Sequence, residues 1–473
     1  MSAAGLLIVL PCLSALVLAA MPRWAPRLNI LASAATLLLA LNLPVGEAEA
    51  AALLRVDALS FPFVLIGAVV GLGTAVFSLQ DVEHEGFDIR RTRYFHAAFQ
   101  GFMAAHFLAL LSDNLGVMWV AIEAGTLACV LMVALHRTPA ALEAAWKFFI
   151  LCGVGIALAL FGIIVLAFSA QALLGHGEQL SYIALRSVAA RADAGLLNLA
   201  FVLMLVGFGT KAGLVPLHSW LPDAHAEGPT SIAAVLSGLL LNAAMLGILR
   251  GKTIVSMHAQ ILPPGGFLLA LGFATLLVAA FSLWRRRDAK RLFGWSSIEH
   301  MGIVAIAFGV GGTAGHMAGL LHLWGHSLVK SAAFFAVGRA ARIKGAQSIE
   351  AIGGLVATHP ALGWGLVLAM AGLAGLPPFA IFAAELLLAF EMGQGFPLLL
   401  PILLLGWLVA GTALLRNMQR LCFGNPTPDE MPAAAGLPTL LPLWINLALA
   451  AMLAVAMPAP LAAMLREAAR VLA

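Results

Sequence analysis

The stretch FVLMLVGFGTKAGLVPLHSWLPDAH, residues 201–225, decides the fold of this chain. It is apolar and long enough to cross a bilayer, yet it contains a lysine, Lys211, and a proline, Pro216. Proline lacks a backbone N–H, and an interrupted helix is tolerated in a membrane only where it lines protein or water. The stretch therefore predicts a membrane helix that is broken beside a hydrated, ionisable side chain.

The composition of the whole chain indicates an integral membrane protein. Of 473 residues, 62% are hydrophobic and 10% are charged, whereas soluble domains have about 45–50% and about 25%. So few charges cannot cover a soluble surface, which excludes a soluble enzyme, a secreted disulfide scaffold and a nucleic-acid-binding protein. The four cysteines form no CxxC pair, so the sequence predicts no iron–sulfur or zinc site and no cofactor.

Fourteen segments are long and apolar enough to be membrane helices of an all-α protein. They are 4–21, 27–43, 59–79, 94–112, 114–135, 147–169, 196–218, 229–250, 264–284, 297–311, 316–338, 361–391, 396–415 and 439–465. The first has no positive region before it and is interpreted as a membrane helix rather than a cleaved signal.

The positions of lysine and arginine predict the orientation, because these residues stay on the cytoplasmic side of a membrane. With the N-terminus outside, the cytoplasmic connections hold 17 of the 26 basic residues and the outer connections hold 7. The remaining two, Lys211 and Lys330, lie inside helices. This bias and the even number of spans predict a multi-pass membrane protein with both termini on the outer side.

Ionisable side chains occur inside the predicted helices, although each costs about 2.5–3.5 kcal/mol at the bilayer centre. Glu123 lies near the middle of 114–135, and Lys211 lies beside the break in its helix. His218 and His225 continue the polar track from Lys211 toward the cytoplasm. We expect Glu123 to be a carboxylate that responds to a lysine on another helix.

The segment 316–338 carries a line of proton-exchanging groups. His322, His326 and Lys330 are spaced four residues apart, which places all three on one helix face. Histidine and lysine in this register are typical of an intramembrane proton relay.

Two further sites carry charge. Glu299 and His300 open the segment 297–311, where the simplest interpretation is a first-turn acid and cap that complement the helix dipole. Glu385 follows the glycines and prolines that break 361–391, much as Pro216 breaks 196–218.

Broken helices in corresponding places of two halves indicate an inverted-repeat transporter with its site at the breaks. The predicted organisation is 1–93 for helices 1–3, 94–250 for the first five-helix repeat, 264–421 for the second, and 439–473 for helix 14. Helices 7 and 12 are the broken ones.

Three long motifs carry a resemblance to a known family. They are GFGTKAGLVPLHSWLPDAHAEGPTSIAAVLSGLLLNAAMLGILR (207–250), DAKRLFGWSSIEHMG (288–302) and HLWGHSLVKSAAFFAVG (322–338). In this order they resemble signatures of the antiporter-like membrane subunits of respiratory complex I, group 4 hydrogenases and Mrp-type cation/proton antiporters. The form SSIEHMG is most similar to hydrogenase-4 component F.

The resemblance implies a role in proton translocation for individual residues. It pairs Glu123 with Lys211 and makes His322, His326 and Lys330 the central relay.

The resemblance also makes Glu385 the terminal group of the relay and His218 the histidine after the helix 7 break. Many members have a bridging lysine where this chain has Asn242, and an amide cannot hold a transferred proton. The proton would then need water, His218 or His225 to pass Asn242. Glu299 and His300 are secondary candidates for proton translocation.

The resulting hypothesis is proton translocation coupled to redox chemistry in partner subunits. The chain itself has no visible redox centre, so it would be a membrane subunit of a hydrogenase- or NADH:quinone-oxidoreductase-like complex. Its expected partners are other membrane and peripheral subunits, the lipid bilayer and protons. Two alternatives remain open: an Mrp-like cation/proton antiporter subunit without a redox partner, and a membrane subunit that energises inorganic-carbon uptake.

Overall fold

The computed structural model describes residues 2–21, 23–46, 53–175, 177–426 and 437–473. Every named element in this part of the chain is a helix. The α-helices are α1 (Ala3–Ala20), α2 (Ala25–Leu41), α3 (Ser60–His84), α4 (Ile89–Leu111), α5 (Leu115–Val133), α6 (Pro139–Ser169), α7 (Tyr182–Val188), α8 (Ala194–Lys211), α9 (Trp220–Glu227), α10 (Thr230–Val235), α11 (Leu241–Val255), α12 (Pro264–Leu283), α13 (Ala289–Val310), α14 (Gly312–Lys344), α15 (Ile349–Ile352), α16 (Leu355–Thr358), α17 (Pro360–Leu373), α18 (Ala380–Gly395), α19 (Leu400–Phe423), α20 (Leu437–Val455) and α21 (Ala459–Leu472).

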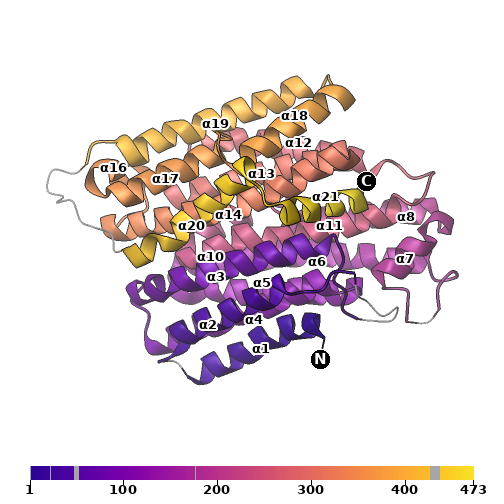
Figure 1. Cartoon of the computed structure of the whole chain (residues 1–473), viewed down its shortest axis with the longest axis horizontal. Helices are drawn as coiled ribbons and strands as arrows, with labels where there is room; N and C mark the ends of the chain where they lie inside the picture. The colour runs from indigo at the N-terminus through magenta and orange to yellow at the C-terminus, as the bar shows by residue number, and fades with distance from the viewer. Residues whose placement is uncertain (1, 22, 47–52, 176, 427–436) are drawn as a thin grey trace.

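The long helices lie side by side in one bundle (Figure 1). The N-terminal helices α1, α2 and α4 lie along one side, and α18 and α19 lie along the opposite side. The 33-residue helix α14 is central, because it packs against α13, α17, α18, α20 and α21. A residue on α14 can therefore contact several helices at once.

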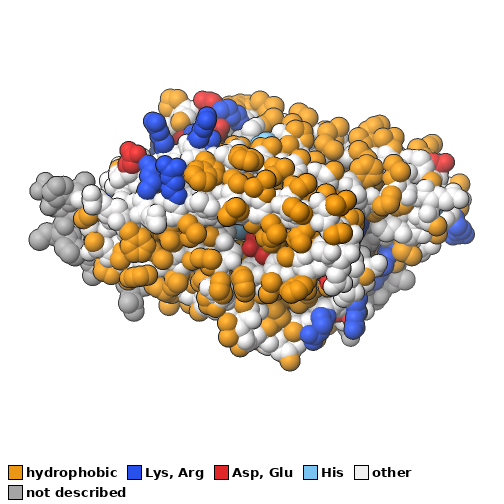
Figure 2. All heavy atoms as spheres, turned by 90° about the horizontal axis from the view of Figure 1, so that it is seen from above, with side chains coloured by type: hydrophobic (Ala, Val, Ile, Leu, Met, Phe, Trp, Pro, Cys, Tyr) orange, Lys and Arg blue, Asp and Glu red, His pale blue; other side chains and the backbone are white. Residues whose placement is uncertain are grey.

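The surface and the helix lengths confirm a multi-pass membrane protein. Ten helices in the described residues are long and apolar enough to cross a bilayer, or up to twelve if each of two bent pairs counts as one span. Figure 2 shows hydrophobic side chains over the middle of the viewed face, while lysine and arginine gather toward its two ends. This distribution is what a hydrocarbon layer with aqueous edges selects.

Both predicted breaks are present and have similar backbones. After α8 the chain turns at Gly213, with φ of +78°, and after α17 it turns at Gly375, with φ of +68°. Glycine adopts this left-handed backbone conformation without a steric penalty because it has no Cβ atom, whereas other residues are strained there. Each break also contains a cis peptide bond, before Pro216 and before Pro378.

Some predicted boundaries differ from the structure. The segment 439–465 is not one continuous helix, because α20 ends at Val455 and α21 starts at Ala459 after a bend of 74°. Pro458 precedes α21 and cannot continue the hydrogen bonding of α20. The predicted helix 297–311 begins earlier, at Ala289, because Asp288 caps it by accepting a hydrogen bond from Arg291 N.

Candidate functional site

The end of α8 holds a buried ion pair. Lys211 is fully buried, and its Nζ donates to Glu123 Oε2 at 2.7 Å. It also donates to the hydroxyl of Thr126, which lies three residues after Glu123 on the same face of α5. The predicted pairing of Glu123 with Lys211 is therefore present as a direct contact between α5 and α8. Thr126 is a further partner, which the sequence did not indicate.

Close packing of α6 and α8 positions Lys211. A Cβ atom on Gly207 would lie 2.4 Å from the backbone nitrogen of Ala159, and one on Gly155 would lie 2.5 Å from Cβ of Thr210. Glycine at both places lets the two backbones approach closely, as small residues do in membrane helix pairs. The last turn of α8 is thereby fixed against α6.

Glu123 also faces the outside of the bundle. Its side chain keeps 20% of its surface exposed and lines an apolar groove of about 540 Å³ between α5 and α6. Trp119, Phe149 and Phe161 line the same groove. The carboxylate therefore contacts Lys211 on one side and an open apolar face on the other.

A histidine cluster lies between α13 and α14. His300 Nδ1 is 3.0 Å from His322 Nε2, and the ring of His300 is 5.3 Å from that of His326. Glu299 Oε2 lies 3.5 Å from His300 Nε2. The first-turn interpretation of Glu299 and His300 is wrong: α13 starts ten residues before Glu299, so both are buried in mid-helix against α14.

Glu385 reaches this cluster from α18. Its donor atoms and those of His300 and His322 all lie within 4.8 Å of one another. A Cβ atom on Gly375 would lie 2.2 Å from Glu385 Oε2, so the glycine at the break leaves room for the carboxylate. The predicted terminal group thus meets the predicted central relay at His322.

Lys330 lies one turn beyond His326 and is fully buried. Its Nζ donates to the carbonyl oxygen of Phe293 at 3.0 Å and lies 5.7 Å from the centre of the Phe293 ring. Within the described ranges it forms no ion pair with a carboxylate. Lys330 therefore differs from Lys211, which has a direct carboxylate partner.

Asn242 connects α11 to the relay helix. Its Nδ2 donates to Gly238 O and to Ser327 Oγ, each at 2.8 Å. Gly238 lies in a π-helical segment, Leu236–Leu240, that joins α10 to α11. The amide therefore lies next to the residue that follows His326.

The two histidines after the α8 break differ. His218 is half-buried, its Nδ1 lies 3.2 Å from Pro216 O, and its ring packs against Trp295; no described contact joins it to Lys211. His225 is fully buried on α9, and its ring stacks on Phe334 at 4.9 Å. His225 Nε2 has no hydrogen-bond partner.

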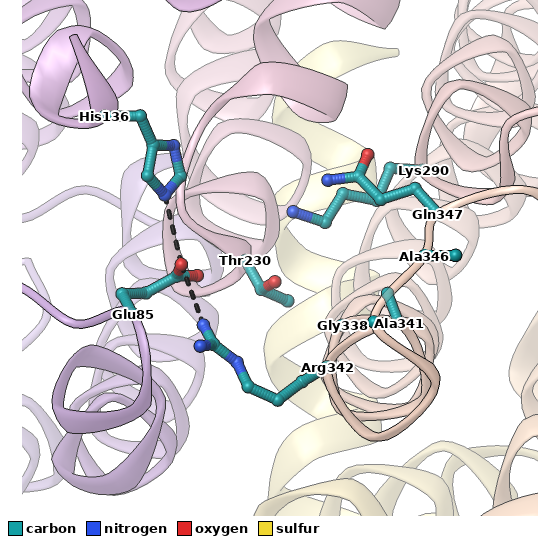
Figure 3. Close-up of a pocket in the computed structure, with 10 residues that line it drawn as sticks. Glu85, His136, Thr230, Lys290, Gly338, Ala341, Arg342, Ala346 and Gln347 are labelled. Carbon is teal, nitrogen blue, oxygen red and sulfur yellow. Dashed lines mark hydrogen bonds and ion pairs between the residues drawn. The ribbon is translucent and has the colours of Figure 1, made fainter. Parts of the chain in front are cut away.

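A pocket at the basic end of the bundle was not anticipated. It measures about 360 Å³ and lies where α3, α13 and α14 meet. Glu85 on one wall is 3.1 Å from His136 Nε2 and 2.7 Å from Arg342 Nη2. Lys290 extends toward it from the opposite wall (Figure 3). In the sequence these residues appear only as charges near helix ends, so nothing local groups them.

Glu85 is strongly held in its ionised form. Burial raises the pKa of its carboxyl, but the hydrogen bond from His136 and the positive charges around it lower the pKa further, from 4.5 to about 2. The pocket therefore has a fixed negative charge between two cationic walls.

Comparison with known proteins identifies relatives of this chain. Residues 112–409 match the family described as NADH:quinone oxidoreductase/Mrp antiporter, TM. A hydrogenase-4 component F homolog of Methylacidiphilum infernorum is 47% identical over 382 residues, which cover 80% of each chain. NADH-quinone oxidoreductase subunit N of Deinococcus radiodurans is 30% identical over 87% of this chain and 84% of its own.

A solved structure shows the same fold. A chain of the membrane-bound sulfane sulfur reductase, an archaeal respiratory membrane complex, superposes with a TM-score of 0.87 at 21% identity, over 99% of this chain and 97% of that one. The match to more than half of the chain, the 47% identical relative and this fold confirm the resemblance of the three motifs. The chain belongs to the NADH:quinone oxidoreductase/Mrp antiporter family of membrane subunits.

Proposed function

We propose that this chain translocates protons across the membrane as a subunit of a hydrogenase- or NADH:quinone-oxidoreductase-like complex, in which partner subunits carry out the redox chemistry. The observation that carries the proposal is a series of buried and partly buried titratable side chains in the bundle. It runs from the ion pair of Glu123 and Lys211 to the cluster at His322 and Glu385. The 47% identity to a hydrogenase-4 component F homolog supports the hydrogenase-type assembly.

Opening and closing of the Glu123–Lys211 pair would drive the proton. With the pair closed, the carboxylate stabilises the buried ammonium. With the pair open, the same ammonium is buried without a counter-charge, which favours loss of its proton toward the relay. The partly exposed Glu123 can respond to a neighbouring subunit, because it faces the groove between α5 and α6.

The relay would continue along α14. Asn242 cannot carry a proton but can orient a water molecule beside Ser327, since its Oδ1 has no partner. From there the proton would pass through His326 and His322 to Glu385, with Lys330 one turn beyond His326 on the same helix face. Water must fill the gaps, because the side chains do not form a continuous contact.

The pocket at the basic end is a suitable place for proton uptake. Lys290 on its wall precedes Phe293 by one turn, and Phe293 O accepts the hydrogen bond from Lys330. His225 lies nearby, because Phe334 contacts both His225 and Phe293. These contacts support a route from the pocket to Lys330 that avoids Asn242.

The proposal includes an arrangement in the membrane. The predicted fourteen spans correspond to α1 to α6, α8, α10 with α11, α12 to α14, α17 with α18, α19, and α20. We propose that 94–250 and 264–421 are inverted repeats, with 1–93 and 439–473 as flanking helices. Both termini would lie on the outer side of a bacterial inner membrane.

Substitution in the assembled complex tests the function. Glu123→Gln or Lys211→Ala, reconstituted with the partner subunits in vesicles, is expected to abolish proton pumping while assembly is retained. The measurement is the number of protons moved per electron. Glu143→Gln, which removes an exposed acid paired with Lys147 on α6, is the matched control and should pump normally. An unchanged ratio in the Glu123 and Lys211 variants contradicts the proposal.

The family match also favours a second candidate, a cation/proton antiporter subunit of the Mrp type. The two functions differ in what drives transport. Proton movement that follows an imposed sodium gradient, without an electron donor, supports the antiporter. Movement that requires electron transfer supports the redox-coupled subunit.

A further inference from the structure

Three metal-ligating side chains converge where α13, α14 and α18 meet. His300, His322 and Glu385 each bring one donor atom within 4.8 Å of the other two. The closest pair is His300 Nδ1 and His322 Nε2, at 3.0 Å. Both histidines are at most 1% exposed, so the set is formed by the packing of the bundle.

The atoms behind these ligands also fit a metal site. His300 turns Nδ1 toward His322, and its other nitrogen, Nε2, lies 3.5 Å from Glu299 Oε2 without a hydrogen bond between them. A histidine that binds metal through one nitrogen commonly donates the other N–H to a carboxylate, which orients the ring. Nδ1 of the buried His322 has no partner in the described part of the chain.

The donor types select the class of ion. Two imidazoles and a carboxylate suit zinc and similar transition metals, whereas magnesium and calcium prefer oxygen donors. Neighbouring nitrogens in a tetrahedral zinc site lie about 3.3 Å apart, given zinc–nitrogen bonds of about 2.0 Å. His300 Nδ1 and His322 Nε2 lie 3.0 Å apart, so only a small increase in this distance is needed to admit the ion.

The three ligands differ in burial. Glu385 is partly exposed, while the two histidines behind it are buried. The carboxylate is thus the outermost of the three ligands, and the imidazoles lie behind it.

We propose that His300, His322 and Glu385 bind a divalent transition metal ion, with Zn²⁺ as the best fit, and that the bound ion blocks proton transfer. Binding uses the nitrogen lone pairs and the carboxylate oxygens that would otherwise accept the proton. The blocking part rests on the proposed function, whereas the binding part does not.

Binding is tested on the purified full chain in detergent, with Co²⁺ as a spectroscopic probe and Zn²⁺ as competitor. We expect about one ion per chain, a visible Co²⁺ spectrum of tetrahedral type, and its loss on adding Zn²⁺. His300→Gln and Glu385→Gln should each weaken binding by at least tenfold. His106→Gln, a buried histidine that packs on Phe102 away from the cluster, is the matched control and should bind like the wild type.

Glu299→Gln is a second test that leaves all three ligands in place. It should weaken binding by about 10-fold to 100-fold, as loss of an orienting carboxylate does. Absence of a tetrahedral Co²⁺ spectrum in the wild-type chain overturns the site, and so does wild-type affinity in the His300 and Glu385 variants.

The blocking effect is measured separately, as proton pumping by the reconstituted complex with and without Zn²⁺. Inhibition that His300→Gln relieves supports the block. Zn²⁺ binding without inhibition overturns only the block, while a complex that never pumps contradicts the proposed function and leaves the binding result intact.

Discussion

At the scale of single residues, several buried polar atoms on or beside α14 have no hydrogen-bond partner among the described residues. Nδ1 and Nε2 of His326, Nδ1 of His322 and Oδ1 of Asn242 are all buried and form no hydrogen bond within the described structure. A buried polar group without a partner costs about 1–3 kcal/mol. Ordered water commonly satisfies such groups in proteins, and here it would also supply the proton wire.

Lys211 provides the first prediction at this scale. Thr126→Val keeps the shape of the side chain but removes the hydroxyl that binds Lys211. We expect a loss of stability of about 1–3 kcal/mol, because a buried ammonium loses a partner, together with slower proton pumping. Unfolding in detergent measures the first effect. Thr412→Val on the exposed face of α19 is the control and should change little.

Glu85 provides a prediction about pH. Its pKa is lowered in the folded protein from 4.5 to about 2, so its contribution to stability is complete above pH 4.5 and is lost as the pH falls toward 2. Glu85→Gln should therefore destabilise the chain at pH 7 and much less at pH 2.5. Unfolding at both pH values tests this. Glu350→Gln, in an exposed pair with Arg420, should show only a small difference at either pH.

At the scale of helices, glycine seams bring specific faces together. Gly155 and Gly207 join α6 to α8, and Gly272 and Gly302 join α12 to α13 in the same way. Without these close approaches, Lys211 would not be held near Glu123, and α13 would not be held against α12. The position of ionisable groups is thus determined partly by residues that have no side chain.

Gly207→Leu tests this seam. Because even a Cβ atom at Gly207 would lie 2.4 Å from the backbone of Ala159, the helices must separate. We expect a loss of stability of about 1–3 kcal/mol, as overpacking commonly produces, and reduced pumping. Gly153→Ala on α6, the helix that Gly207 packs against, is the control, because nothing lies within 4 Å of its Cβ position. Equal stability of both variants would contradict the role of the seam.

At the scale of the whole molecule, the distribution of charge predicts the orientation in the membrane. Figure 1 shows both termini toward the end of the bundle where α7 lies, and α16 toward the other end. The basic connections, including the loop after α14, belong to the end opposite the termini. The positive-inside bias then predicts that the termini lie outside the cytoplasm.

Thiol labelling in intact cells measures this orientation. In a chain without its four native cysteines, Ala473→Cys should react with a membrane-impermeant reagent from outside. Gly345→Cys, at the end of α14, should react only after the membrane is permeabilised. Reaction of Gly345→Cys in intact cells would contradict the predicted orientation.

The sequence by itself determined the class of protein, the two helix breaks and the alignment of His322, His326 and Lys330. These properties are local: they follow from the length of apolar segments, from proline and glycine, and from the four-residue repeat of a helix. Local patterns cannot say which helix faces meet, because that depends on packing between segments far apart in the chain.

Only the tertiary structure decided that Glu299 and His300 lie in mid-helix beside His322, that Glu385 joins them, and that Thr126 binds Lys211. It also decided that Glu85 and Lys290 share a pocket. In each case the partners come from different helices, and their approach depends on how closely the backbones pack. Apolar segments drive insertion into the membrane, but side-chain fit between helices determines where the charges meet.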